Sequence, residues 1–448
     1  MVKIEVTKPS FTEVSLLPKP LYQIEQELSA RLSCLSSAQA DGLALWVYGT
    51  LLAGNACQNA VLTALTLACS DNSKPRLDND EWNRLRQRLK EWSRDGEKKS
   101  RACQSQVEVE ACFPFLLTWA LSWLGLGSKA SDRPCEPVFL AIDATTIRER
   151  FTALVISVLY RGCAVPVAWR ILQGNTKEAW IEPIQELLGH LHEGLKTPST
   201  TYIKSDVEFI VLADRGLWSP RLYNSILALG WHPMMRVQNG IHFEPCQGKP
   251  GKAMRLLSVG EAWVGRGIAF KKQERQLQAT LAALWAPGKE QPCLVLTDLA
   301  PNKVDACWYS LRAWIEAGFR ALKSMGWQCE RSRRSDVTRV ARHWLVLAVA
   351  TLYALAEGAA LEDRSDINLY PRHLNKRSGH AGKRIVSIFR LGLMSVQRQL
   401  IRGALPIARN NGYRRKLLAQ SLPRLPDSIR LTVHPFHSFE LTPETGHT

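Results

Sequence analysis

The sequence predicts an α/β core with a β-rich insert, an all-α domain before this core and a basic helical tail after it. Three observations favour this organisation. Apolar residues recur at helical spacing up to about residue 128, short apolar runs typical of strands begin at residue 138, and lysine and arginine are frequent after residue 362. With 448 residues, the chain is long enough for about two or three domains.

Residues 1–128 are expected to form the all-α domain. Its apolar segments have helical spacing or are continuous buried runs, and Gly, Ser, Asp and Pro separate them. These segments are Leu21–Leu35, Leu43–Cys69, Asn79–Trp92 and Val107–Leu126. The polar, proline-containing stretch 127–137 is typical of a linker. We therefore expect the helical domain to end before residue 138.

Residues 138–361 are expected to form the α/β core. The runs VFLAI (138–142) and FIVLA (209–213) are typical of buried strands, and each is followed directly by an aspartate, Asp143 and Asp214. Thr152–Tyr160 and Val165–Ile171 predict a meander together with the first run. Helices are predicted at Ile181–His192, Pro220–Leu229, Val304–Ser324 and Val337–Ala360.

Two regions differ from this core in composition. From about 235 to 299, frequent glycine and proline and alternating charges predict a β-rich insert. Residues 362–448 form the basic C-terminal region, which includes RHLNKRSGHAGKR, FRLGLMSVQRQLIR and YRRK. We expect this region to contact a polyanion, the alternative being a solvated basic tail.

The charge balance favours a polyanionic partner. Lys and Arg total 58 and Asp and Glu total 41, which gives a formal net charge of +17. Nucleic acid and an anionic membrane surface both fit this charge. No signal peptide is expected at Met1–Phe11, and the apolar stretches Leu43–Cys69 and Trp344–Ala356 are interrupted or shorter than the ~20 residues of a membrane span. The eleven cysteines contain no CxxC pair, so we expect neither a zinc site nor a disulfide framework, and a reducing cytoplasm fits.

The two strand-end aspartates are candidate catalytic groups. In α/β sheets, ligands and catalytic groups collect where strands end. An aspartate after a strand also commonly caps the next helix, which is the structural alternative for Asp143 and Asp214 alike. Asp298 follows the apolar run CLVLT in the same way. Strand-end position alone therefore does not select a pair.

A more specific pattern lies between Tyr309 and Lys323. Tyr309, Arg312, Glu316 and Lys323 fall within an arc of about 60° on an ideal α-helix. A carboxylate on this face can bind a metal while its cationic neighbours bind phosphates. The alternative is a solvated helix face with Arg312 and Glu316 as an ordinary i,i+4 ion pair.

The pattern Tyr-x2-Arg-x3-Glu-x6-Lys resembles the signature of bacterial cut-and-paste transposases of the insertion-sequence-four class. The chain is also similar to this class in the Ala-Thr-Thr that follows Asp143, in ADRGLW, which contains Asp214 and Arg215, and in the later LKSMG. The resemblance covers about residues 138–360. It implies an RNase-H-like catalytic core, interrupted by a β insert before the catalytic glutamate.

The resemblance implies a DDE transposase whose catalytic, metal-binding carboxylates are Asp143, Asp214 and Glu316, with Asp298 uninvolved. Two Mg²⁺ ions, which Mn²⁺ can replace, suit oxygen ligands and support phosphodiester cleavage. The implied activity is cleavage of insertion-element ends and transfer of 3′ hydroxyls into target DNA. The alternatives are a catalytically silent, transposase-derived DNA-binding protein and a metal-dependent nuclease of the same fold without strand transfer.

The implied partners are double-stranded DNA, as terminal repeats and target, and a second copy of the chain in a homodimer on the DNA ends. No membrane partner is expected, and the implied location is the bacterial cytoplasm, at the nucleoid. The helical domain is expected to help recognise the element's ends. The expected DNA contacts are Tyr309, Arg312, Lys323 and Arg215, with Arg312 and Lys323 directed at phosphates and not at metal.

Trp263 and Trp285 are the candidates for stacking on a base flipped out near the cut. Some relatives carry a tryptophan on the strand before the signature. Counted back from Tyr309, that position falls near Pro292 and Cys293, and neither is aromatic. The structural alternative for both tryptophans is packing within the insert.

Overall fold

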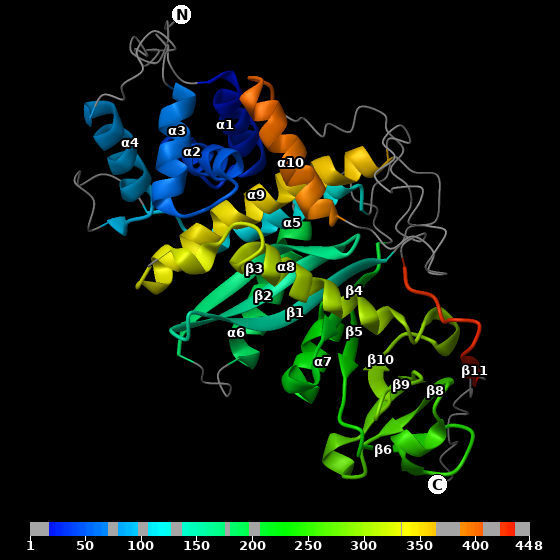
Figure 1. The fold of residues 1–448 in the computed structure, drawn as a ribbon. Coiled ribbons are helices and arrows are strands. Elements are labelled where there is room, and N and C mark those ends of the chain that lie inside the picture. Colours follow the sequence, from blue (N-terminus) through cyan, green and yellow to red (C-terminus); the bar gives the residue numbers. More distant parts are fainter. Residues whose placement is uncertain are drawn as a thin grey trace, which may run out of the picture.

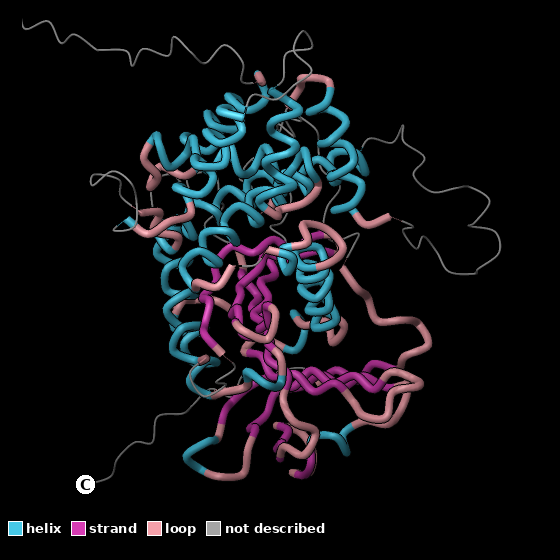
Figure 2. The backbone as a smooth tube through the Cα atoms, turned by 60° about the vertical axis from the view of Figure 1, so that its left-hand side comes forward, coloured by secondary structure: helices cyan, strands magenta, loops and turns pink. Residues whose placement is uncertain are grey.

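The strands form one mixed sheet in this computed structural model, which describes residues 18–69, 79–96, 106–126, 137–174, 180–196, 207–332, 334–363, 386–405 and 422–434. The strand order is β3-β2-β1-β4-β5-β10-β9-β8-β6-β7, with β11 paired to β8. Figures 1 and 2 show the N-terminal helices gathered at one end of the molecule and the last strands of the sheet at the other.

The N-terminal region is helical in the part that the structure describes. Its helices are α1 (Lys19–Arg31), α2 (Ser37–Ala53), α3 (Gln58–Cys69), α4 (Asn79–Trp92) and α5 (Phe113–Leu124). The expected segment Leu43–Cys69 is two helices, because Gly54 has a φ of 59° and ends α2. These helices share a continuous apolar core with the sheet and with later helices.

The meander expected from the sequence is confirmed. β1 (Val138–Ile147), β2 (Phe151–Tyr160) and β3 (Cys163–Gln173) pair antiparallel in order. β4 (Phe209–Ala213) then pairs parallel with β1, and β5 (His232–Arg236) pairs parallel with β4. The helices α6 (Ile181–Leu195) and α7 (Pro220–Ala228) connect these strands. Every residue of β2 and β4 is buried, which explains why their sequences are almost entirely apolar, with Thr152 and Ser157 of β2 as buried polar residues.

The region expected to be a β-rich insert does contain strands, and they extend the core sheet. β10 pairs antiparallel with β5 and continues the sheet through β9 and β8. Residues 235 and 236, which were assigned to the insert, belong to core strand β5. The strands beyond it are β6 (His242–Pro245), β7 (Gly251–Lys252), β8 (Glu261–Ala269), β9 (Leu277–Trp285) and β10 (Cys293–Thr297).

The segment that carries the signature begins with a tighter turn than expected. The 3-10 helix η9 (Trp308–Arg312) leads directly into α8 (Ala313–Lys323), so Tyr309 and Arg312 precede the α-helix that carries Glu316. α8 packs on the meander, where Gly318 lies close enough to Ala164 that an added Cβ would be 3.0 Å from its Cβ.

The longest helix lies in the protein core. α9 (Val337–Asp363) is long and apolar enough to cross a membrane, but 94% of its most apolar window is buried inside the protein. α10 (Ile388–Ile401) packs closely on it through Gly392, where an added Cβ would collide with the Ala354 carbonyl oxygen. The expected basic segments 372–384 and 413–416 lie outside the described residues. The only strand that the structure describes after α10 is β11 (Arg430–Val433).

Candidate active site

Asp143 lies on β1, and Asp214 directly follows the parallel neighbouring strand β4. The paired part of β1 and β4 ends at Ile142 and Ala213, and the two aspartates are the next residues on their strands. Adjacent strands are about 4.8 Å apart, so the two carboxyl groups share one edge of this pairing. Asp143 was expected directly after a strand, but β1 continues to Ile147 because its other edge remains paired with β2.

Arg312 contacts both aspartates and also the third acid, Glu316. Arg312 Nη2 donates to Asp143 Oδ2 at 2.8 Å and lies 3.7 Å from Asp214 Oδ2, and Nη1 lies 3.5 Å from Glu316 Oε1. One guanidinium group therefore contacts the carboxylates of Asp143, Asp214 and Glu316. The sequence pattern predicts a contact with DNA phosphates for Arg312, whereas here it faces the acids.

The three carboxylates differ in exposure. The side chain of Asp143 is 18% exposed, that of Asp214 38% and that of Glu316 60%. Burial raises the pKa of the Asp143 carboxyl, and the charge of Arg312 opposes this rise. Backbone amides stabilise the aspartates, since Ala144 N donates to Asp143 at 2.9 Å and Arg215 N donates to Asp214 at 2.7 Å.

Tyr309 and Lys323 each contact another residue of the protein. The Tyr309 hydroxyl donates to the Ala213 carbonyl oxygen at 3.3 Å, and its ring is buried. This bond ties η9 to the residue before Asp214. Lys323 Nζ lies 3.5 Å from Glu330 Oε1. Arg215 is exposed beside Asp214 in the short helix η5 (Arg215–Leu217).

Asp298 takes part in a different interaction. Its Oδ2 lies 2.8 Å from His232 Nδ1, which joins the residue after β10 to the first residue of β5. Sequence analysis did not find this pair, because the two residues are 66 positions apart. The bond raises the pKa of His232. Asp298 thus has a structural partner of its own.

The two candidate stacking residues differ in accessibility. Trp263 is 4% exposed and its ring packs edge-on against Phe243. Trp285 is half-buried, and its Nε1 donates to the Lys289 carbonyl oxygen at 2.9 Å. Trp263 is therefore part of the apolar core, while part of the Trp285 ring can be reached from outside.

The donor chemistry of Asp143, Asp214 and Glu316 fits a hard divalent cation. All three supply carboxylate oxygens, and they surround a positive charge, that of Arg312. Within the described ranges, no group of three or more His, Cys, Asp or Glu side chains is arranged to hold a metal ion. In this structure the three carboxylates contact the Arg312 guanidinium group.

Comparison with known proteins agrees with this geometry. Residues 134–353 match the family model described as transposase DDE domain. The matched segment contains all three acids and the signature helix. None of the curated proteins matches the chain.

The likeness to a solved structure is weak. One similar chain is endonuclease V of Ciona intestinalis, in complex with a 24-mer DNA that contains an inosine followed by a ribo-adenosine. The two chains are 14% identical, the alignment covers 46% of this chain and 92% of that chain, and the TM-score is 0.24. A likeness this weak carries no argument about fold or function.

The fold and the site are consistent with an α/β core of the nuclease-like kind, in which acids at neighbouring strands meet a glutamate from a helix. The match over residues 134–353 supports a DDE transposase and hence a protein that acts on DNA.

Proposed function

We propose that this protein is a cut-and-paste DNA transposase of the insertion-sequence-four class, with an RNase-H-like catalytic core. The observation that carries the proposal is the meeting of Asp143, Asp214 and Glu316 around one cationic group. Three acids from distant parts of the chain would repel one another unless a cation lay between them. The transposase DDE match spans the same residues.

The three carboxylates act as ligands of two Mg²⁺ ions in this proposal, and Mn²⁺ can replace them. When bound, such ions activate a hydroxyl and stabilise the leaving oxygen of a phosphodiester. Asp143 is fixed by the pairing of β1 with β2, and the Tyr309 hydroxyl holds the end of β4 next to Asp214. Glu316 is the most exposed of the acids and can adjust its position.

Arg312, Lys323, Arg215 and Tyr309 form the DNA-binding group of this site. To bind DNA, Arg312 must exchange its contacts with the carboxylates for a contact with a phosphate. Lys323 must likewise break its ion pair with Glu330. Both exchanges replace one charge-assisted contact with another. The net charge of +17 favours association with DNA along the rest of the surface.

The partners in this proposal are the terminal repeats of an insertion element, target DNA and a second copy of the chain. Residues 1–128 recognise the element's ends, residues 138–361 carry the chemistry, and residues 362–448 contact the DNA backbone. The two copies form a homodimer on the paired ends. The protein would act in the bacterial cytoplasm, at the nucleoid.

The proposal is tested with purified protein, Mg²⁺ and a duplex that carries the terminal repeat found beside the gene. We expect cleavage at the repeat and joining of the new 3′ hydroxyl to a target plasmid. DNA that is bound but never cut would indicate a silent DNA-binding protein. DNA that is cut but never joined would indicate a nuclease.

A further inference from the structure

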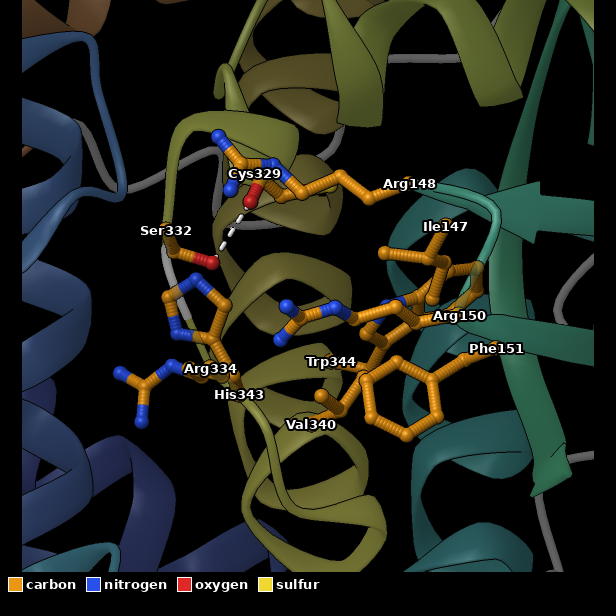
Figure 3. Close-up of a pocket in the computed structure, with 10 residues that line it drawn as sticks. All are labelled: Ile147, Arg148, Arg150, Phe151, Cys329, Ser332, Arg334, Val340, His343 and Trp344. Carbon is orange, nitrogen blue, oxygen red and sulfur yellow. Dashed lines mark hydrogen bonds between the residues drawn. The ribbon is translucent and has the colours of Figure 1, made fainter. Parts of the chain in front are cut away.

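A basic cavity lies between the β1–β2 hairpin and the start of α9. Its volume is about 360 Å³, and Arg148, Arg150 and Arg334 line it together with His343, Phe151 and Trp344. Figure 3 shows Arg150 extending from the hairpin toward His343. The cavity is larger than a phosphate group needs and lies at the lower end of the range for small organic ligands.

The arginines of this cavity have no acidic partner on its walls. None of the ten lining residues is Asp or Glu. Arg334 lies over the Trp46 ring at 5.2 Å, and its Nε atom is buried without a hydrogen-bond partner among the described residues. Burial and the charge of Arg339 lower the pKa of Arg334 to about 10, whereas Arg148 and Arg150 are exposed and can bind an anion at the mouth of the cavity.

His343 gives independent evidence for a ligand. It is 2% exposed, and neither of its ring nitrogens has a hydrogen-bond partner within the described part of the chain. Burial lowers the pKa of His343 well below its usual value, and the charge of Arg334 lowers it further. The ring is therefore neutral, and can both donate and accept. Burying such a group without a partner is unfavourable, and a polar ligand would supply the missing hydrogen bond.

The hairpin turn holds its arginines in a strained conformation. Arg148 and Glu149 have φ angles of 51° and 58°, a region that glycine or asparagine normally occupies. Residues other than glycine are strained in this region. The turn thereby points Arg148 and Arg150 at the cavity from adjacent positions.

The cavity lies on the same face of the sheet as the acids. Ile147, in its wall, is four residues after Asp143 on β1, and the intervening residues pair regularly with β2. Residues four apart on a strand point to the same face and are about 13 Å apart. α8 also links the acids to the cavity. It carries Glu316 and Lys323, and Lys323 pairs with Glu330, which directly follows the cavity-wall residue Cys329 in the sequence.

We propose that this cavity binds one nucleotide of a DNA strand that leads away from the cleavage position, with its phosphate on Arg148 and Arg150 and a phosphate oxygen hydrogen-bonded to the His343 ring. The inference rests on the proposed transposase function and adds a binding site to it. The exposed guanidinium groups of Arg148 and Arg150 suit a phosphate, and the unpartnered His343 ring can donate to one of its oxygens.

The test is photo-crosslinking of the full-length protein, in EDTA, to a single-stranded oligonucleotide with 5-iododeoxyuridine at one position at a time. We expect a crosslink at a residue of the β1–β2 hairpin or of the cavity wall, located by mass spectrometry. The double variant R148Q/R150Q should reduce its yield at least fivefold, and R150Q alone should reduce it less. The matched control is R221Q, because Arg221 is an exposed arginine of α7 outside the cavity and the acids.

Folding of each variant is checked by circular dichroism, and both hairpin arginines are exposed. Crosslinks that never map to the cavity, or that survive in R148Q/R150Q as in R221Q, would overturn the nucleotide site. Equal competition by inorganic tripolyphosphate at the same phosphate concentration would do so too, since it would reveal a general anion site. A protein that crosslinks at the cavity but never cuts terminal-repeat DNA with Mg²⁺ would overturn the transposase proposal and leave this site intact.

Discussion

Arg312 Nη2 lies 2.8 Å from Asp143 Oδ2, and the same nitrogen lies 3.7 Å from Asp214 Oδ2. One guanidinium group thus contacts two carboxylates at adjacent strands and offsets part of their negative charge. The side chain of Arg312 is 14% exposed, so its charge is poorly screened by water at this position. A metal ion that binds the acids must compete with the Arg312 charge. If Arg312 is displaced, its guanidinium group becomes available to bind DNA.

The first prediction concerns this competition. R312Q should bind Mn²⁺ about tenfold more tightly than the wild type when no DNA is present, because no cation is left to displace. Its affinity for terminal-repeat DNA should fall. Isothermal titration calorimetry with Mn²⁺ measures the first effect. R312K is the charge-retaining control, and unchanged Mn²⁺ affinity in R312Q would show that the two cations do not share one place.

The second prediction concerns the acids themselves. D143N, D214N and E316Q should each reduce cleavage of terminal-repeat DNA by at least about a thousandfold, because each variant removes one charged metal ligand. Gel-shift affinity for the same DNA should stay within about threefold of the wild type, since fewer negative charges do not weaken phosphate binding. D298N is the matched control, because Asp298 contacts His232. Loss of cleavage in D298N with activity in D214N would mean that the wrong aspartate was chosen.

The third prediction is a pH dependence of stability from His232. Its pKa is raised above 6.5, first by the hydrogen bond to Asp298. A group whose pKa is higher in the folded protein contributes stability that is complete below the unfolded pKa and is lost as pH rises through the folded pKa. The melting temperature of the wild type relative to H232Q should therefore be highest at about pH 6 and decline above it. A difference that does not change between about pH 6 and pH 9 would contradict the pair.

The fourth prediction concerns a buried ion pair at the turn between β2 and β3. Arg161 is 5% exposed and lies 2.8 Å from Asp363 Oδ1 at the end of α9. R161M leaves the acid, itself 4% exposed, without its partner, and should lower the free energy of unfolding by about 3–5 kcal/mol. R170M is the control, because Arg170 pairs with the more exposed Glu186 and its loss should cost about 0–1 kcal/mol. Urea unfolding measures the free energy of unfolding of both variants. Equal losses in R161M and R170M would contradict the larger contribution expected of the buried pair.

The sequence predicts the meander and the two aspartates well because these features are local. An apolar run that ends in an aspartate is visible in a few residues, and the pairing of β1 with β4 brings Asp143 to Asp214. The continuation of β1 to Ile147 was missed, since polar Thr145 and Thr146 resemble the end of a strand and only pairing with β2 extends it.

Long-range contacts explain the remaining differences. A helical wheel places Arg312 beside Glu316, but it contains no information about Asp143, 169 residues earlier. The partner of Asp298 and the basic cavity depend in the same way on segments far apart in sequence. The arginines at positions 148 and 150 were visible, yet only the fold brings them to His343.

The last prediction concerns base stacking near the cut. A transposase that bends one DNA strand sharply can relieve the bend by removing a base from the stack, at a cost of a few kcal/mol. An aromatic side chain returns about 1–3 kcal/mol by stacking on that base. Trp285 has a partly accessible ring, whereas Trp263 is buried against Phe243. We therefore expect Trp285 to be the stacking residue of the two.

The measurement places 2-aminopurine at successive positions near the element's end and records its fluorescence on binding. Stacking on Trp285 should quench the flipped base in the wild type, and W285A should leave it bright while W285F retains part of the quenching. W263A should bind with an unchanged signal, although its melting temperature should fall because a core side chain is removed. Identical signals for the wild type, W263A and W285A would exclude both tryptophans, and the base would then be unstacked by other residues or remain paired.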